Sequence, residues 1–101
     1  MAMNIPVVGI NIYSVPKGKE EEFFRWWQDM RDTLMLGTGI VTGRLHRNLE
    51  ADAQFNFINV AEWENELYST MYRNHAARMQ LELKELGAKM IPGLFGIASS
   101  Y

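Results

Sequence analysis

The sequence predicts an α+β fold in which four strands and two helices follow one another in the order β-α-β-β-α-β. Four segments are rich in β-branched and aromatic residues, as strands are. Two longer segments between them repeat apolar residues at helical spacing. Glycine, proline and asparagine separate most of these segments, as expected for turns.

The first strand is predicted over Val7–Val15, where Val, Ile and Tyr dominate and Pro16 follows. Three acids at Glu20–Glu22 are typical of the first turn of a helix, which favours negative charge. The apolar positions of this helix are Phe23, Trp27, Met30 and Leu34. The helix should end before Gly37, because glycine commonly follows the last helical residue.

The other expected elements are a strand over Ile40–Arg47, a strand over Phe55–Trp63, a helix over Glu64–Leu86 and a last strand over Leu94–Tyr101. The second helix carries an apolar stripe and a break near Arg73-Asn74. Gly87 is its expected C-cap, and Pro92-Gly93 is expected to form a turn. The complete order is that of a ferredoxin-like subunit with an antiparallel sheet.

Two helices cover only one face of such a sheet, so the other face needs a different cover. We expect that face to carry the aromatic residues Tyr13, Phe55, Phe57 and Trp63. Because an exposed apolar patch of this size is rare on a monomer, a second copy packed sheet to sheet is predicted. The space enclosed between the two sheets is then the expected ligand pocket.

Composition narrows the class of protein. The chain has 101 residues, which fits one domain over 1–101, and a formal net charge of −2. No basic excess is present to neutralise phosphates, so nucleic-acid and anionic-membrane partners are not expected. No cysteine is present, which excludes disulfides and thiolate chemistry. We find neither a secretion signal nor an apolar run of roughly 18 residues, so a cytoplasmic protein is expected.

Four segments together resemble the antibiotic biosynthesis monooxygenase (ABM) domain family. FNFINVAEWEN over 55–65 is similar to the signature of these domains, and RLHRNL over 44–49 resembles the segment before it. PKGKEEEF and the later PGLF fall where the family has its first helix start and its last strand. The resemblance implies a dimeric α/β barrel of ferredoxin-like subunits.

The resemblance leaves several functions open. One branch consists of cofactor-independent oxygenases, which oxidise phenolic or polyketide-type anthrones to quinones with O₂ and need no cofactor. A second branch degrades haem, and a third group cyclises polyketides or isomerises lactones. A non-catalytic ligand-binding or haem-binding protein is a further alternative. We favour an oxygenase, acting in the sheet-enclosed pocket of a homodimer.

Individual residues match the oxygenase branch. Its members use an asparagine and a tryptophan four residues apart on the third strand, and Asn59 and Trp63 match that spacing. These are the expected catalytic pair. The oxygenases also have a tyrosine early in the next helix, which Tyr68 matches if this chain has one residue fewer before it. Arg78 lies in the region where their helix carries an arginine.

The haem-degrading branch is matched less well. Its first-strand asparagine corresponds to Asn11. Its histidine ligand would fall near Leu81, and His75 lies too early in the chain. The expected substrate-binding residues are Asn11, Tyr13, Phe57, Tyr68, Tyr72, His75 and Arg78. No group of side chains has the spacing of metal ligands, so no metal is expected.

Each candidate also has a structural interpretation. A buried asparagine amide needs partners, so Asn59 either holds a substrate oxygen or bonds a neighbouring side chain. Trp63 either donates its indole N–H to a reacting oxygen or fills the core. His46 could act as a general base near neutral pH, although a surface position is expected for it.

Overall fold

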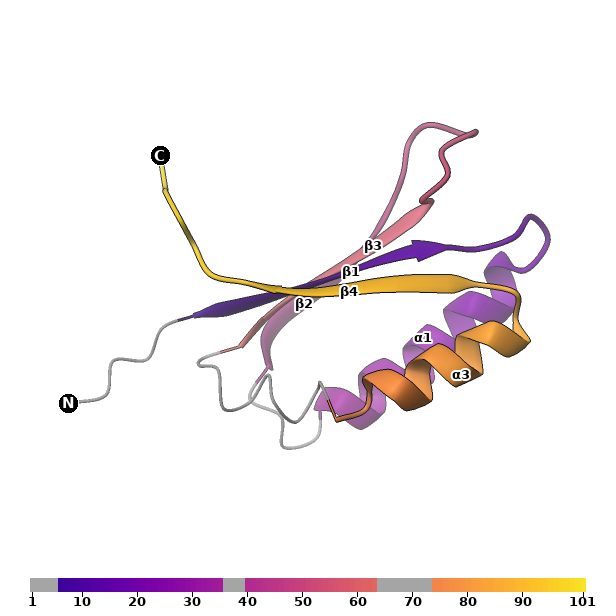
Figure 1. Ribbon diagram of the computed structural model, residues 1–101, viewed down its shortest axis with the longest axis horizontal. Coiled ribbons are helices and arrows are strands. Elements are labelled where there is room, and N and C mark those ends of the chain that lie inside the picture. Colours follow the sequence, from indigo (N-terminus) through magenta and orange to yellow (C-terminus); the bar gives the residue numbers. More distant parts are fainter. Residues whose placement is uncertain (1–5, 36–39, 64–73) are drawn as a thin grey trace.

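The computed structural model describes residues 6–35, 40–63 and 74–101 of the chain (Figure 1). The described elements are β1 (Val7–Ser14), α1 (Glu20–Met35), β2 (Ile40–Arg47), β3 (Phe57–Trp63), α3 (Ala76–Glu85) and β4 (Lys89–Phe95). All four strands form one antiparallel sheet in the order β2-β3-β1-β4. This is the strand order of a ferredoxin-like subunit, which confirms the predicted fold class.

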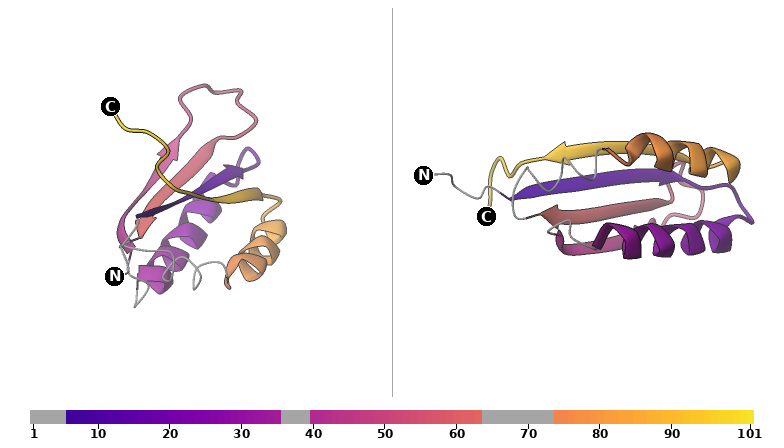
Figure 2. Two further views of the ribbon diagram at one scale, coloured as in Figure 1. Left: turned by 60° about the vertical axis from the view of Figure 1, so that its left-hand side comes forward. Right: turned by 90° about the horizontal axis from the view of Figure 1, so that it is seen from below.

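Both described helices lie on the same face of the sheet (Figures 1 and 2). The residues of β1 and β3 that face them alternate with residues on the open face, as the pleat of a strand requires. The buried core occupies this helix-covered face. Its apolar members are Tyr13, Val15, Phe23, Phe57, Ala61, Trp63, Met79, Leu83, Ala88 and Met90.

Phe23 joins α1 to the sheet. Its ring centroid lies 5.0 Å from that of Tyr13, in an edge arrangement, and 5.0 Å from that of Phe57, in a stacked arrangement. The side chain is fully buried. Offset and edge contacts between aromatic rings add to the free energy gained by burial, so this residue fixes α1 over β1 and β3.

The predicted position of the large aromatic residues was wrong. Tyr13, Phe57 and Trp63 were expected on the uncovered face, but they lie under the helices, each at most 2% exposed. Both faces of β1 and β3 are apolar, so the alternation in the sequence did not reveal which face the helices cover. Phe55 lies before β3 and is half-buried.

Two strand boundaries also differ from the sequence prediction. Pro92 and Gly93 do not form a turn but lie within β4, and residues 96–101 are not part of a strand. Proline is tolerated here because β4 is an edge strand, where one N–H has no partner strand to bond. Strand β3 begins at Phe57, because the side chain of Asn56 bonds the main-chain N–H and carbonyl of Val15.

The second predicted helix is confirmed over Ala76–Glu85, and Met79 and Leu83 are buried as expected. Asn74 and His75 form a turn before it, close to the predicted break. Residues 64–73 lie outside the described part of the chain. Gly87 ends the helix with φ +71°, which confirms the predicted cap. No helix within the described residues is long and apolar enough to span a membrane.

Replacing Phe23 with alanine is expected to lower the free energy of unfolding by about 3–5 kcal/mol, since a fully buried ring is lost and a cavity remains. Chemical denaturation measures this change. Leu49→Ala is the control, because Leu49 is 96% exposed and its truncation should change stability by less than about 0.5 kcal/mol. Equal effects of the two substitutions would contradict the assigned core.

Candidate functional site

Two asparagines face each other at the centre of the helix-covered face. Asn11 on β1 is paired with Asn59 on β3, and these are the two inner strands of the sheet. Asn11 is 2% exposed and Asn59 is 8% exposed. Polar side chains buried this deeply on neighbouring strands form a polar centre within an otherwise apolar layer.

The amide oxygens of this pair have no hydrogen-bond partner among the described residues. Oδ1 of Asn11 and Oδ1 of Asn59 are buried, and neither accepts a hydrogen bond from any residue in the described ranges. The nitrogen Nδ2 of Asn11 donates to the phenol oxygen of Tyr13 over 3.4 Å, a long hydrogen bond. An unsatisfied buried acceptor lowers the free energy of unfolding by about 1–3 kcal/mol. Two such acceptors side by side therefore point to a role in binding and not in stability.

Aromatic rings enclose the asparagine pair. Tyr13 lies two residues from Asn11 on the same face of β1, and its ring contacts Trp26 of α1 at a centroid distance of 6.2 Å. Trp63 ends β3 on the same face, and its indole lies over Gly9. These rings supply flat apolar surfaces, while the amides supply donors and acceptors between them.

Burial raises the pKa of the Tyr13 phenol far above its ordinary value, and the hydrogen bond from Asn11 opposes that shift without cancelling it. The phenol is therefore protonated at every pH near neutrality. Tyr13 can donate a hydrogen bond to a ligand or accept one from Asn11, but it cannot serve as a phenolate base.

A groove of about 220 Å³ lies between the two helices. Figure 2, in its right-hand view, shows α1 and α3 over the same face of the sheet, each near a different edge, with the inner strands between them. The walls are formed by Trp26, Asp29, Met30 and Thr33 on one side and by His75, Arg78, Met79 and Glu82 on the other. Since Trp26 also contacts Tyr13, the groove and the asparagine pair share one aromatic wall.

The carboxylate of Glu82 connects the two helices across this groove. It accepts a hydrogen bond of 3.2 Å from the indole Nε1 of Trp26 and one of 3.0 Å from Nε of Arg78. Arg78 is 75% exposed in its side chain, so this ion pair contributes little stability by itself. Its geometric effect is to orient the arginine along the rim of the groove.

The structure divides the predicted site residues into two groups. Asn11, Tyr13, Phe57, Asn59 and Trp63 lie together on the helix-covered face, whereas the sequence placed their pocket between two sheets. His75 and Arg78 lie apart from them and line the groove between the helices. Tyr68 and Tyr72 lie outside the described residues. His46 is exposed, as expected.

Sequence reasoning missed Trp26 and Glu82. Trp26 is partly buried, and Phe23, Trp26 and Met30 follow one another at spacings of three and four, which places them on one helix face. The same spacing of four joins Arg78 to Glu82. Within the described residues no cluster of His, Cys, Asp or Glu could hold a metal ion.

Comparison with solved structures extends these observations. A "putative monooxygenase" from Shewanella loihica is 29% identical, with a TM-score of 0.77, and the match covers 98% of this chain and 100% of that one. A "putative antibiotic biosynthesis monooxygenase" from Deinococcus radiodurans is 13% identical, with a TM-score of 0.69, over 94% and 95% of the chains. The chain therefore shares its fold with ABM-type proteins.

SnoaB, a cofactor-independent oxygenase from Streptomyces nogalater, is also similar to this chain. It is 22% identical, with a TM-score of 0.72, over 95% of this chain and 96% of that one. At this identity, as at that of the Deinococcus protein, the likeness establishes the fold alone. No family model matches the sequence, and no curated protein matches it either.

The raised pKa of Tyr13 predicts a loss of stability at high pH. Above its ordinary pKa of 10.0 the phenol ionises in the unfolded chain but stays protonated in the folded one. The free energy of unfolding should therefore fall by about 1.4 kcal/mol for each pH unit above 10 on account of this residue. Tyr13→Phe should remove that component, as denaturation at pH 9 and pH 11 would show. An unchanged pH dependence in the variant would contradict the buried phenol.

Proposed function

We propose that the chain is a cofactor-independent oxygenase that oxidises a phenolic or polyketide-type aromatic substrate with O₂. The observation that carries this proposal is the facing pair Asn11 and Asn59, buried among aromatic rings, with neither amide oxygen satisfied by a described residue. An amide offers an acceptor and a donor side by side. It therefore complements an aromatic compound that carries a hydroxyl group next to a carbonyl group.

The reaction proposed is the conversion of an activated ring CH₂ into a carbonyl group. The CH₂ first loses a proton, and the resulting carbanion, drawn as an enolate, transfers an electron to O₂. Recombination of the two radicals and return of the proton give a hydroperoxide, R₂CH–OOH. Loss of water breaks the O–O bond and gives R₂C=O. One CH₂ and one O₂ thus yield one C=O and one H₂O, and the substrate supplies all electrons.

Asn59 is assigned to the enolate oxygen. Its NH₂ group would donate a hydrogen bond to this oxygen, whose negative charge grows as the proton leaves, and such donors act strongly in sites that exclude water. Trp63 lies four residues further along the same face of β3, roughly 13 Å away along the strand. It would flank the ring carbon that meets O₂. A flat substrate of several rings spans that distance.

No strong base is assigned to this site. Tyr13 is excluded as a phenolate because burial raises its pKa. The substrate must therefore lose its proton without a strong base. A hydroxylated anthrone can do so because it is itself acidic, since its enolate is aromatic. Tyr13 would keep Asn11 in place through their hydrogen bond.

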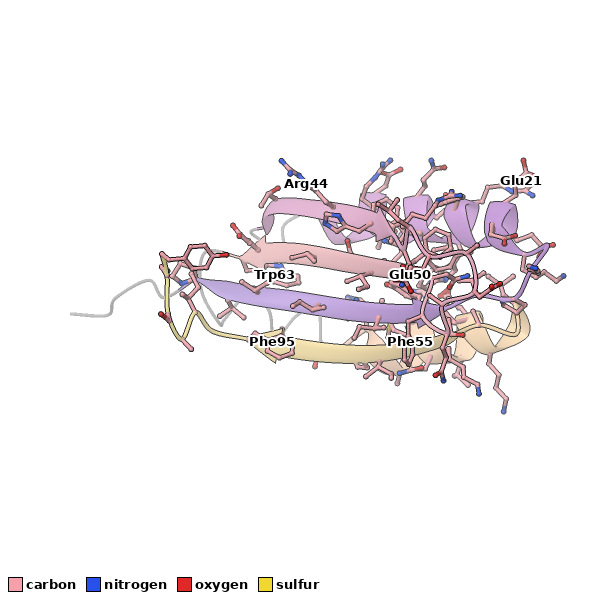
Figure 3. All side chains as sticks on the ribbon, turned by 90° about the horizontal axis from the view of Figure 1, so that it is seen from above. Glu21, Arg44, Glu50, Phe55, Trp63 and Phe95 are labelled. Atoms are coloured by element: carbon pink, nitrogen blue, oxygen red, sulfur yellow. The ribbon has the colours of Figure 1, made fainter. Side chains whose placement is uncertain are left out.

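The chain is further proposed to work as a homodimer formed through the open face of the sheet. That face carries partly buried or exposed apolar residues of three strands, namely Val8, Ile10, Ile12, Ile58, Val60, Ile91 and Phe95. Figure 3 looks onto this face, where Phe95 is labelled. A contiguous apolar surface on a sheet with no helices over it favours a twofold pairing of identical faces.

Asn59→Ala tests the reaction. With 1,8-dihydroxyanthrone as substrate, oxygen uptake should show kcat lowered by roughly 10²–10³-fold, because one oxyanion donor is lost. Oxygen uptake also separates the proposed oxidation from cyclisation or isomerisation in the same pocket, which consume no O₂.

Asn59→Leu is the companion variant. Leucine has the same branched shape and number of side-chain heavy atoms and removes the unsatisfied oxygen, so the variant's free energy of unfolding should equal or exceed that of the wild type while activity is lost. Full activity in the alanine variant, or strong destabilisation in the leucine variant, would show that Asn59 serves the structure instead.

Ile91→Glu tests the homodimer. Ile91 is 51% exposed in the subunit, so a charge there should leave the fold intact but place two glutamates in a sheet-to-sheet interface. Sedimentation should find twice the chain mass for the wild type and a single chain for the variant. Leu81→Glu is the control, since Leu81 is 68% exposed on α3 and should not affect association. A monomeric wild type would refute the proposed assembly.

A further inference from the structure

Gly9 lies beside the asparagine pair, in the next row across the helix-covered face. Its partners in that row are Ala61 on β3 and Leu94 on β4, and Gly43 pairs with Ala61 from β2. A Cβ atom built on Gly9 would lie 2.8 Å from Cη2 of Trp63 and closer still to Cζ3 of the same ring. Real Cβ atoms do not approach other atoms so closely. The indole therefore occupies the space that any other residue would fill.

The backbone offers no separate reason for glycine at this position. Gly18 and Gly87 have positive φ angles, whereas Gly9 is not among the glycines with positive φ. Glycine within a strand costs roughly 0.5–1 kcal/mol relative to alanine, and it often marks a place where another group approaches the backbone. In this protein the approaching group is the outer ring of Trp63.

The position of the indole determines how much space remains over the sheet. An indole lying against the backbone of β1 extends less far towards the helices than one lifted by a methyl group. The displaced ring would move into the layer between sheet and helices, next to the row that holds Asn59 and Asn11. This is the layer in which the proposed substrate would lie.

We propose that Gly9 is the positioning residue for Trp63 and sets the size of substrate that the site accepts. By letting the outer ring of the indole lie close to the backbone of β1, it admits a planar compound of several fused rings beside Asn59. This inference rests on the proposed function for its choice of ligand. The placement of the indole itself can be measured independently.

Three glycine-to-alanine variants make a matched set. Gly9→Ala creates the collision with Trp63. Gly43→Ala adds a methyl group in the same row of the same face, where the nearest atom is an ordinary 3.7 Å away. Gly93→Ala also creates a collision, 2.6 Å from Cε2 of Phe95, but on the open face and against a half-exposed ring. The set separates displacement of Trp63 from added bulk and from general strain in the sheet.

Two aryl ketones serve as binding probes. 1,8-Dihydroxyanthraquinone has three fused rings, and 2′-hydroxyacetophenone has the same hydroxyl and carbonyl pair on one ring. Gly9→Ala should weaken binding of the three-ring probe by about 10–200-fold, the range for one surplus or missing methylene group in a packed site. Binding of the one-ring probe should change little. Neither probe should be affected in this way by Gly43→Ala or Gly93→Ala.

A second readout follows the indole directly. In protein labelled with 5-fluorotryptophan, the resonance of position 63 is the one that disappears in Trp63→Phe. Gly9→Ala should shift this resonance, whereas Gly43→Ala and Gly93→Ala should leave it in place. Adding Trp63→Phe to Gly9→Ala should restore binding of the three-ring probe, because a phenyl ring lacks the outer indole atoms that collide with the methyl group.

The outcomes distinguish this inference from the proposed function. An unshifted resonance in Gly9→Ala, or equal losses of binding in Gly9→Ala and Gly93→Ala, would overturn the inference. If the three-ring probe binds with the expected dependence on Gly9 but the wild type consumes no O₂ with the anthrone, the inference stands and the oxygenase function fails. If neither probe binds to the wild type, both are contradicted.

Discussion

The antiparallel register between β1 and β3 is the constraint on which the rest of the site depends. It places Asn11 opposite Asn59, Tyr13 opposite Phe57 and Gly9 opposite Ala61, all on the face covered by the helices. Because strand side chains alternate between faces, a slip of one residue would move each member of a strand's set to the open face. The aromatic contacts of Phe23 with Tyr13 and Phe57 hold this register, since they fit only one alignment of the two strands.

The fold could be predicted from the sequence because it depends on periodicity and turn residues, which are local signals. The limits of β1, β2 and α1 followed from apolar runs bounded by Pro16 and by a glycine-containing segment. The limits of β4 could not be predicted in this way. Pro92-Gly93 indicates a turn in most contexts, but it can lie within a strand at the edge of a sheet. That property belongs to the complete sheet and not to the segment.

The candidate site could be predicted only in part, for a related reason. Asn11 and Asn59 were recognised as candidates from a family resemblance, but their pairing depends on register. Trp63 was recognised, yet its face was assigned wrongly, because both faces of the inner strands are apolar. Glu82 gave no signal, since its connection to Trp26 spans 56 residues of sequence. Which polar side chains come together in the site depends on contacts between elements distant in the sequence, and these contacts leave no local pattern.

The edge position of Pro92 has a consequence for the behaviour of the protein at high concentration. The outer edge of a sheet presents a row of main-chain donors and acceptors to which a strand of another molecule can add. Proline interrupts that row in the middle of β4, because it has no N–H to offer, and the exposed Lys89 adds a charge near the start of the strand. A foreign strand could therefore bond only short stretches of this edge. The chain is protected there against the edge-to-edge growth that leads to amyloid-like aggregates.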